Sequence, residues 1–254
     1  MSALDGFDAR PFRAPIAGGA QVTHDVYEKG DGPPVVIIQE LPGIGPETLT
    51  LADRFVAAGF RVVLPHLFGP LGKISMVGNL GRVFCLRQEF HLFAKNRSSP
   101  IVDWLKALCR DVRSARDARG VGVIGMCLTG NFAISLMADD SVLAAVASQP
   151  SLPIVVGQST LHMSDDEIAA VRRRLDTVGP MYAYRFDGDR LCTRTKFDAI
   201  DRTFNRDGRE RVKLVTLPGS GHSVLTLDFV DEQGHPTQQA LATTLSYFAE
   251  KLKP

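Results

Sequence analysis

Residues 121–138 place a cysteine where a nucleophile would be well supported. A short β-branched run ends in Gly125-Met126-Cys127-Leu128-Thr129-Gly130, and apolar residues then recur at helical spacing. This pattern predicts a strand, a sharp turn that carries Cys127, and a helix. The first N–H groups of such a helix favour a thiolate, and that of Leu128 could bind the oxyanion of an acyl-transfer intermediate. The alternative interpretation is an inert, buried cysteine between strand and helix.

A cysteine nucleophile needs a base and a group that orients the base. Of the six histidines, His222 follows a predicted strand in a Gly-Ser-Gly loop, from which an imidazole could reach across the strand ends. Asp189, in the loop after the preceding strand, is the preferred acid, and Asp187 remains the alternative. The order Cys127, Asp189, His222 at three successive strand ends predicts a catalytic triad.

Glu40 ends an apolar run directly before a Leu-Pro-Gly loop. It is either a solvated strand terminus or a charge at the same sheet edge as Cys127. If Glu40 faces the thiol, the two groups compete for a proton and for hydrogen bonds. The N–H of Leu41 is then the natural second oxyanion donor, beside that of Leu128.

Predicted strands and amphipathic helices alternate along the chain. The expected strands cover 21–27, 35–40, 61–65, 121–126, 144–148, 181–186 and 211–217. The expected helices cover 47–58, 101–118, the residues after Cys127, a segment opened by a capping box at Ser164 and Glu167, 196–204 and 237–252. Irregular excursions are expected at about 66–100 and 150–180. The alternation predicts an α/β fold with a mostly parallel sheet, helices on both faces, and ligands at the carboxyl ends of the strands.

The composition restricts the class of protein. With 254 residues, 44% hydrophobic and 22% charged, the chain has the size and make-up of one α/β domain over residues 1–254. The net charge of +1, without a long run of one sign, argues against nucleic acid or a membrane surface as partner. No apolar run approaches the ~18 residues of a membrane span, and the segment from Met1 to Arg13 is unlike a secretory signal.

The four cysteines are scattered and form no Cys-x-x-Cys pair. This pattern argues against a disulfide framework and a thiol-rich zinc site, so we expect a cytoplasmic protein without cofactor or metal. A metal-dependent hydrolase is a distant alternative, because Cys85, Glu89 and His91 are close in sequence without a recognised ligand spacing.

Five segments together resemble the dienelactone hydrolase family, a branch of the α/β-hydrolases with a cysteine nucleophile. They are residues 36–43, 62–69, 125–130, 186–189 and 221–223, and the resemblance extends from about residue 20 to 252. It implies the α/β-hydrolase fold and a triad of Cys127, Asp189 and His222. It also implies that Glu40 interacts with the thiol, and that the amides of Leu41 and Leu128 bind the oxyanion.

Three positions depart from the family pattern. Thr129 replaces a glycine two residues after the nucleophile, and His66 stands where aspartate is common. Thr226 occupies the position at which enzymes that act on dienelactones carry an arginine for the substrate carboxylate. His66, Arg82 and Arg87 are the candidate substrate-binding residues in and near the first excursion.

These observations favour a carboxylic ester hydrolase of the dienelactone hydrolase (carboxymethylenebutenolidase) type. Its substrate would be a small ester or lactone, cleaved through a thioacyl intermediate by a monomer or homodimer. A thioesterase or acyltransferase could use the same residues. A catalytically inactive homologue that binds a ligand in the same cleft is the alternative from a different class, favoured by Thr129 and Thr226.

Overall fold

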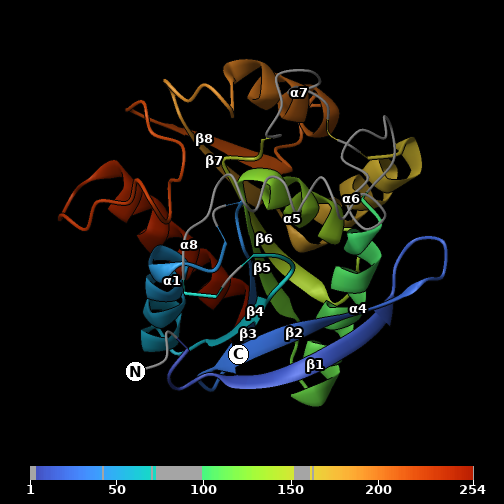
Figure 1. Cartoon of the computed structure of the whole chain (residues 1–254). Coiled ribbons are helices and arrows are strands. Elements are labelled where there is room, and N and C mark those ends of the chain that lie inside the picture. Colours follow the sequence, from blue (N-terminus) through green and yellow to red (C-terminus); the bar gives the residue numbers. More distant parts are fainter. Residues whose placement is uncertain are drawn as a thin grey trace.

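The computed structural model of the chain describes residues 4–41, 43–69, 71–72, 99–151, 161 and 163–253. Its centre is an eight-stranded sheet with the order β1-β2-β4-β3-β5-β6-β7-β8 (Figure 1). The strands are β1 (Asp8–Pro15), β2 (Gln21–Lys29), β3 (Pro34–Ile38), β4 (Arg61–Pro65), β5 (Val121–Met126), β6 (Val142–Ser148), β7 (Met181–Phe186) and β8 (Val212–Leu217). From β4 to β8 every neighbouring pair is parallel, whereas β1 pairs with β2, and β2 with β4, in antiparallel fashion.

Helices cover both faces of the sheet, as the sequence predicts. The helices are α1 (Pro46–Ala57), α4 (Ile101–Ala115), the short 3-10 helix η1 (Cys127–Thr129), α5 (Gly130–Leu136), α6 (Asp165–Val178), α7 (Arg194–Phe204) and α8 (Pro236–Leu252). One core cluster joins α1 and α8 to the sheet, and a second cluster joins α4, α5, α6 and α7 to its other face. Figure 1 shows α1 and α8 to the left of the strands, with α4, α5 and α6 to the right.

The central strands are apolar because they are covered on both faces. Every residue of β3, β4 and β5 is buried, which is typical of parallel strands between two helical layers. β4, β5 and β7 have the predicted bounds, and the predicted strand at 35–40 ends earlier, at Ile38. The fold class inferred from alternation is therefore confirmed.

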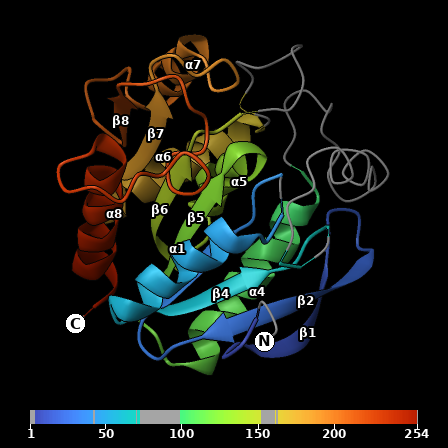
Figure 2. The ribbon, with the colours of Figure 1, turned by 60° about the vertical axis from the view of Figure 1, so that its left-hand side comes forward.

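The N-terminal strand β1 was not predicted. Its residues alternate between outward and inward positions, and the β1–β2 hairpin lies beside α4 at one side of the molecule (Figure 2). Charged residues and prolines obscured this pattern, but an antiparallel edge strand tolerates both because one of its sides faces water.

Helix boundaries follow local signals. α4 ends at Ala115, three residues before the predicted end, and Asp117 there adopts a positive φ of 48°. The capping box that opens α6 is confirmed: Ser164 Oγ accepts from the Glu167 N–H at 3.3 Å, and Glu167 Oε2 accepts from the Ser164 N–H at 3.1 Å. Within the residues that the structure describes, no helix is both long enough and apolar enough to cross a membrane.

Candidate active site

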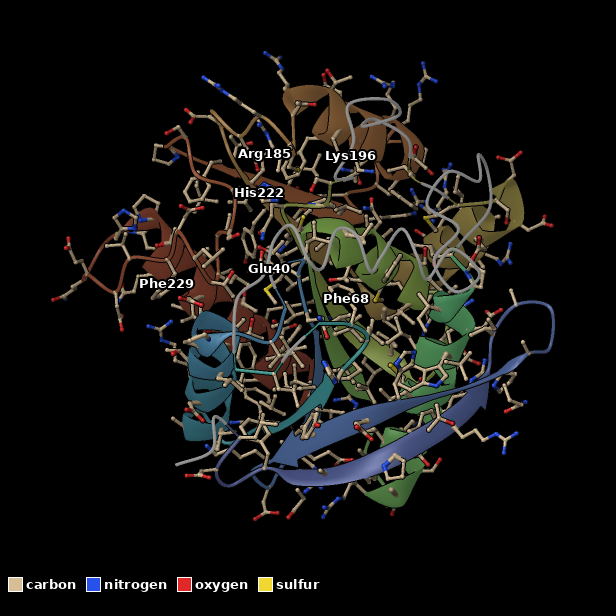
Figure 3. All side chains as sticks on the ribbon, viewed as in Figure 1. Glu40, Phe68, Arg185, Lys196, His222 and Phe229 are labelled. Atoms are coloured by element: carbon tan, nitrogen blue, oxygen red, sulfur yellow. The ribbon has the colours of Figure 1, made fainter. Side chains whose placement is uncertain are left out.

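The carboxyl ends of four parallel strands bring the candidate residues together. Cys127 follows β5, Asp189 follows β7, His222 follows β8, and Glu40 lies two residues beyond β3. Figure 3 shows Glu40 and His222 at the same end of the sheet, where ligands of α/β folds bind. The four candidate residues therefore lie at the carboxyl ends of the parallel strands, where the sequence predicts them.

Cys127 occupies a strained, tightly packed turn. Its φ is +56°, an unusual value for a residue with a side chain, and only 5% of the residue is exposed. A Cβ at Gly125 would lie 2.1 Å from the carbonyl oxygen of Thr129, and one at Gly130 would lie 2.9 Å from Pro150 Cα. Both glycines of the motif are therefore needed for the close approach of strand, turn and helix.

Thr129, which stands where the family pattern has glycine, makes hydrogen bonds through its hydroxyl. Its Oγ1 accepts the N–H of Met126 at 2.9 Å and lies 3.1 Å from the carbonyl oxygen of Ile38, to which it can donate. The hydroxyl therefore connects the end of β5 to the end of β3. It is fully buried and satisfied, so the substitution does not disrupt the turn.

Asp189, and not Asp187, bonds to the histidine. Asp189 Oδ2 lies 2.8 Å from His222 Nδ1, while Oδ1 accepts the N–H groups of Leu191 at 2.8 Å and Cys192 at 3.0 Å. Burial would raise the pKa of Asp189, but the hydrogen bonds and the charge of His222 outweigh it and lower that pKa. Asp187 instead accepts the N–H of Gly219, so the two aspartates have separate partners.

A buried arginine holds the Asp189 loop. Arg185 Nη1 donates to the carbonyl oxygens of Phe186 at 2.8 Å and Cys192 at 3.2 Å, which flank Asp189 in sequence. Its guanidinium lies over the Phe197 ring, 5.5 Å from the centroid. The sequence did not indicate this role, because Arg185 reads simply as a strand residue.

The electrostatics of His222 favour its charged form. Burial lowers the pKa of His222, but the hydrogen bond with Asp189 and the interaction with the Cys127 sulfur raise it to about 10 overall. His222 Nε2 is buried and lacks a hydrogen-bond partner among the described residues. The sulfur of Cys127 is therefore close enough to His222 to contribute to its raised pKa.

The His222 loop is anchored by residues that the sequence did not reveal. Asp228 Oδ2 accepts the N–H groups of His222 at 2.7 Å and Ser223 at 2.8 Å. Gln149 Oε1, at the end of β6, lies 3.3 Å from the N–H of Val224. Asp228 lies six residues after His222. An aspartate in a turn often accepts hydrogen bonds from nearby backbone N–H groups, and this is the sequence signal that could have identified it.

Glu40 is held by the same loop. It is 2% exposed, so the interpretation as a solvated strand end is wrong. Oε2 accepts from Ser223 Oγ at 2.9 Å, and Oε1 accepts from Thr226 Oγ1. Burial raises the pKa of the Glu40 carboxyl, and the two hydroxyl donors and the charge of His222 offset that rise only in part. These bonds join Glu40 to the histidine loop, whereas the sequence had suggested an interaction with the thiol.

A serine touches the candidate nucleophile. Ser151 Oγ lies 3.3 Å from Cys127 Sγ, and Ser151 is fully buried. Ser151 lies 24 positions after Cys127 and in no recognised motif, so sequence reasoning missed it.

The sequence model of the dienelactone hydrolase family matches residues 22–252 of this chain. The chain belongs to the dienelactone hydrolase family. Members of this family are hydrolases, so the arrangement at the strand ends lies on a hydrolase scaffold. No curated protein sequence matches the chain at a significant level.

Solved structures agree with the family's fold. A candidate dienelactone hydrolase of Klebsiella pneumoniae is 16% identical with a TM-score of 0.61, over 94% of this chain and 99% of that one. A cold-adapted esterase from an Arctic intertidal metagenomic library is 13% identical with a TM-score of 0.61, over 98% and 96%. A dienelactone hydrolase-like promiscuous phosphotriesterase from metagenomic libraries is 16% identical with a TM-score of 0.60, over 97% and 99%. At these identities the likeness shows the α/β-hydrolase fold.

Of the three candidate substrate-binding residues, the structure describes His66 alone. His66 Nε2 lies 2.6 Å from the carbonyl oxygen of Gly69, so its ring is engaged by the loop that it begins. Arg82 and Arg87 lie outside the described residues. The alternative metal-ligand candidates Cys85, Glu89 and His91 also lie outside them. Within the described ranges, no group of three or more side chains could hold a metal ion.

Proposed function

We propose that this chain hydrolyses a small, uncharged ester or lactone with Cys127 as nucleophile, His222 as acid and base, and Asp189 as the orienting carboxylate. One observation carries the proposal. Asp189 bonds to Nδ1 of His222 at 2.8 Å, which leaves Nε2 for a proton transfer close to Cys127. This nitrogen is buried and has no hydrogen-bond partner among the residues that the structure describes.

The charged form of His222 supports a thiolate and imidazolium resting pair. The pKa of His222 is raised to about 10, so the imidazole keeps its proton at neutral pH. A positive charge beside the sulfur favours its anion, which is the reactive form of a cysteine. In such a pair, the proton for the leaving group is in place before the substrate binds.

Acylation then needs one nucleophilic attack and one proton transfer. The Cys127 thiolate adds to the carbonyl carbon, and the carbonyl electron pair moves to oxygen. The N–H of Leu128 in η1, with that of Leu41 beyond β3, would receive the oxyanion. Collapse breaks the bond to the leaving oxygen, which takes the proton of His222 Nε2.

Deacylation reverses these roles. Neutral His222 removes a proton from a water molecule that attacks the thioester carbon. Collapse of the second tetrahedral intermediate breaks the carbon–sulfur bond and returns the electron pair to Cys127. The imidazolium and the thiolate are then restored, and the carboxylic acid product releases its remaining proton to solvent as it leaves.

The surroundings of Glu40 support an uncharged substrate. Its carboxyl is buried beside the His222 loop and is bonded to two neutral hydroxyls, of Ser223 and Thr226. Thr226 therefore offers a hydroxyl already engaged by Glu40, where a dienelactone-cleaving relative would offer a cation. A substrate carboxylate placed here would meet a second carboxyl without a compensating charge from this position.

Turnover of an activated ester by Cys127→Ala tests the proposal. We expect the variant to lose detectable hydrolysis of p-nitrophenyl acetate while it keeps the wild-type thermal unfolding transition. Cys109→Ala is the matched control, because Cys109 is a buried cysteine in α4 away from the strand ends. Hydrolysis by Cys127→Ala at the wild-type rate would contradict the assignment.

A further inference from the structure

We propose that Ser151 is a fourth catalytic residue, whose hydroxyl donates a hydrogen bond to the Cys127 thiolate and stabilises this sulfur as the leaving group of deacylation. The inference rests on the proposed function and extends it. It assigns to Ser151 a step in which the carbon–sulfur bond breaks, whereas His222 moves the protons.

The nucleophile turn itself fixes Ser151. The Ser151 N–H donates to the carbonyl oxygen of Cys127 at 3.1 Å. The Ser151 carbonyl oxygen accepts from Asn131 Nδ2 at 3.0 Å, and the same amide nitrogen lies 3.2 Å from the carbonyl oxygen of Leu128. Both backbone groups of Ser151 are thus tied to η1 and α5, so its Oγ stays 3.3 Å from Cys127 Sγ.

A strained residue directs the chain to this place. Gln149 has a φ of +39°, and its N–H donates to the carbonyl oxygen of Tyr184 at 2.7 Å. The bend lets the chain leave β6 and pass over Gly130, where a Cβ would lie 2.9 Å from Pro150 Cα. A non-glycine residue with positive φ persists only where its surroundings hold it, and such positions concentrate at functional sites.

The chemistry of sulfur makes this contact dependent on the reaction step. A thiolate is a good acceptor for a hydroxyl, whereas the sulfur of a thioester is a weak one. In deacylation, water oxygen bonds to the acyl carbon, His222 takes the water proton, and the carbon–sulfur electron pair returns to Sγ. The hydrogen bond from the Ser151 hydroxyl to Sγ strengthens as negative charge appears on the sulfur, so it stabilises the transition state of this collapse.

Acylation should gain less from Ser151. The hydrogen bond increases the fraction of Cys127 present as thiolate, which favours attack. It also makes that thiolate more stable and therefore less nucleophilic, so the two effects on the acylation rate oppose each other. Removal of the hydroxyl should therefore slow deacylation more than acylation, and the acyl-enzyme should accumulate.

Two measurements on Ser151→Ala test the role: the pH profile of alkylation by iodoacetamide, and burst kinetics with p-nitrophenyl acetate. We expect the alkylation midpoint to rise by about one pH unit, and steady-state turnover to fall about tenfold while a full burst remains. Ser141→Ala is the matched control, because it removes a buried, bonded hydroxyl at the other end of β6. Its midpoint and burst ratio should equal those of the wild type.

Superimposable alkylation profiles and equal burst ratios for Ser151→Ala, Ser141→Ala and the wild type would overturn the role of Ser151. Ser151→Gly, which also lacks the hydroxyl, provides the same readouts if Ser151→Ala does not fold. The proposed function fails separately, if Cys127→Ala retains turnover. Even then the alkylation profile still reports whether Ser151 stabilises the thiolate.

Discussion

Glu28 and Glu40 are both buried glutamates on neighbouring parts of the sheet, and they have opposite electrostatic surroundings. Glu28, in β2, accepts from Arg10 Nε at 2.8 Å and lies 2.7 Å from Arg61 Nη2. Burial would raise the pKa of Glu28, but the two arginines lower it. Glu40 has two hydroxyl donors, and burial raises its pKa. The Glu28 carboxylate joins strands of the scaffold. The Glu40 carboxyl lies at the strand ends, and its bonding partners in the described part of the chain are hydroxyls.

Buried charged groups have different surroundings in these two regions of the molecule. In the β1–β2–β4 region each buried charge has an opposite charge in contact, which favours stability. At the carboxyl ends of the strands, Cys127 and Gln149 keep strained backbone angles, and Nε2 of His222 has no hydrogen-bond partner within the described ranges. Both features cost stability. Substitutions in the first region should therefore change the free energy of unfolding, and substitutions in the second should change activity.

The largest effect is expected from Asp189→Asn. The amide keeps the size of the side chain, but it removes the charge that orients His222 and stabilises its imidazolium. We expect kcat to fall by about 10³- to 10⁴-fold, measured with p-nitrophenyl acetate. Asp187→Asn is the matched control, because Asp187 bonds to the backbone of Gly219 and not to His222. Equal losses in both variants would contradict the assignment of Asp189.

A smaller effect, on stability, is expected from Glu28→Gln. Two arginines lose their shared carboxylate, so the free energy of unfolding at pH 7 should fall by about 2 kcal/mol, measured by urea denaturation. Turnover should remain at the wild-type value. A large loss of activity with unchanged stability would remove the contrast between the two regions.

The smallest effect, with the opposite sign, is expected from Glu40→Gln at pH 7. Because the buried carboxyl contacts no arginine or lysine among the residues that the structure describes, its replacement by a neutral amide should raise the free energy of unfolding by about 1 kcal/mol. Turnover should fall, because the amide cannot accept from Ser223 and Thr226 in the same way. A stability loss as large as that of Glu28→Gln would contradict the comparison.

The pH dependence of stability sharpens the same contrast. The folded state lowers the pKa of Glu28, so its contribution is present above the unfolded-state pKa and is lost as pH falls through the folded-state value. The folded state raises the pKa of Glu40, so its contribution is present at low pH and is lost as pH rises through the raised value. Denaturation of the two Gln variants across pH 3–8 should therefore show opposite trends relative to the wild type.

The fold was predictable because its signals are local. Buried parallel strands are continuous apolar runs, and α6 carries its capping box in sequence, so most elements are visible without tertiary information. β1 escaped notice because a hairpin edge of charged residues and prolines has a weak strand signal. The cytoplasmic location and the monomeric or dimeric state stay predictions.

The candidate site was predictable only in part. Cys127, Asp189 and His222 follow β5, β7 and β8, so the topology places all three at the carboxyl ends of the strands, and their catalytic roles stay a prediction. The choice between Asp189 and Asp187 required the geometry of the loop, because both residues lie within the same turn. Ser151, Arg185 and the hydroxyls around Glu40 act through contacts between distant segments, for which no local sequence pattern exists.

The most direct test of the central claim is the detection of the thioester itself. The enzyme is mixed with p-nitrophenyl acetate, quenched with acid before the first turnover is complete, and analysed by peptide mass spectrometry. We predict one acetyl group on the peptide that contains Cys127, and its removal by hydroxylamine. Rapid turnover with an unmodified Cys127 and the acetyl group on another side chain would contradict the account.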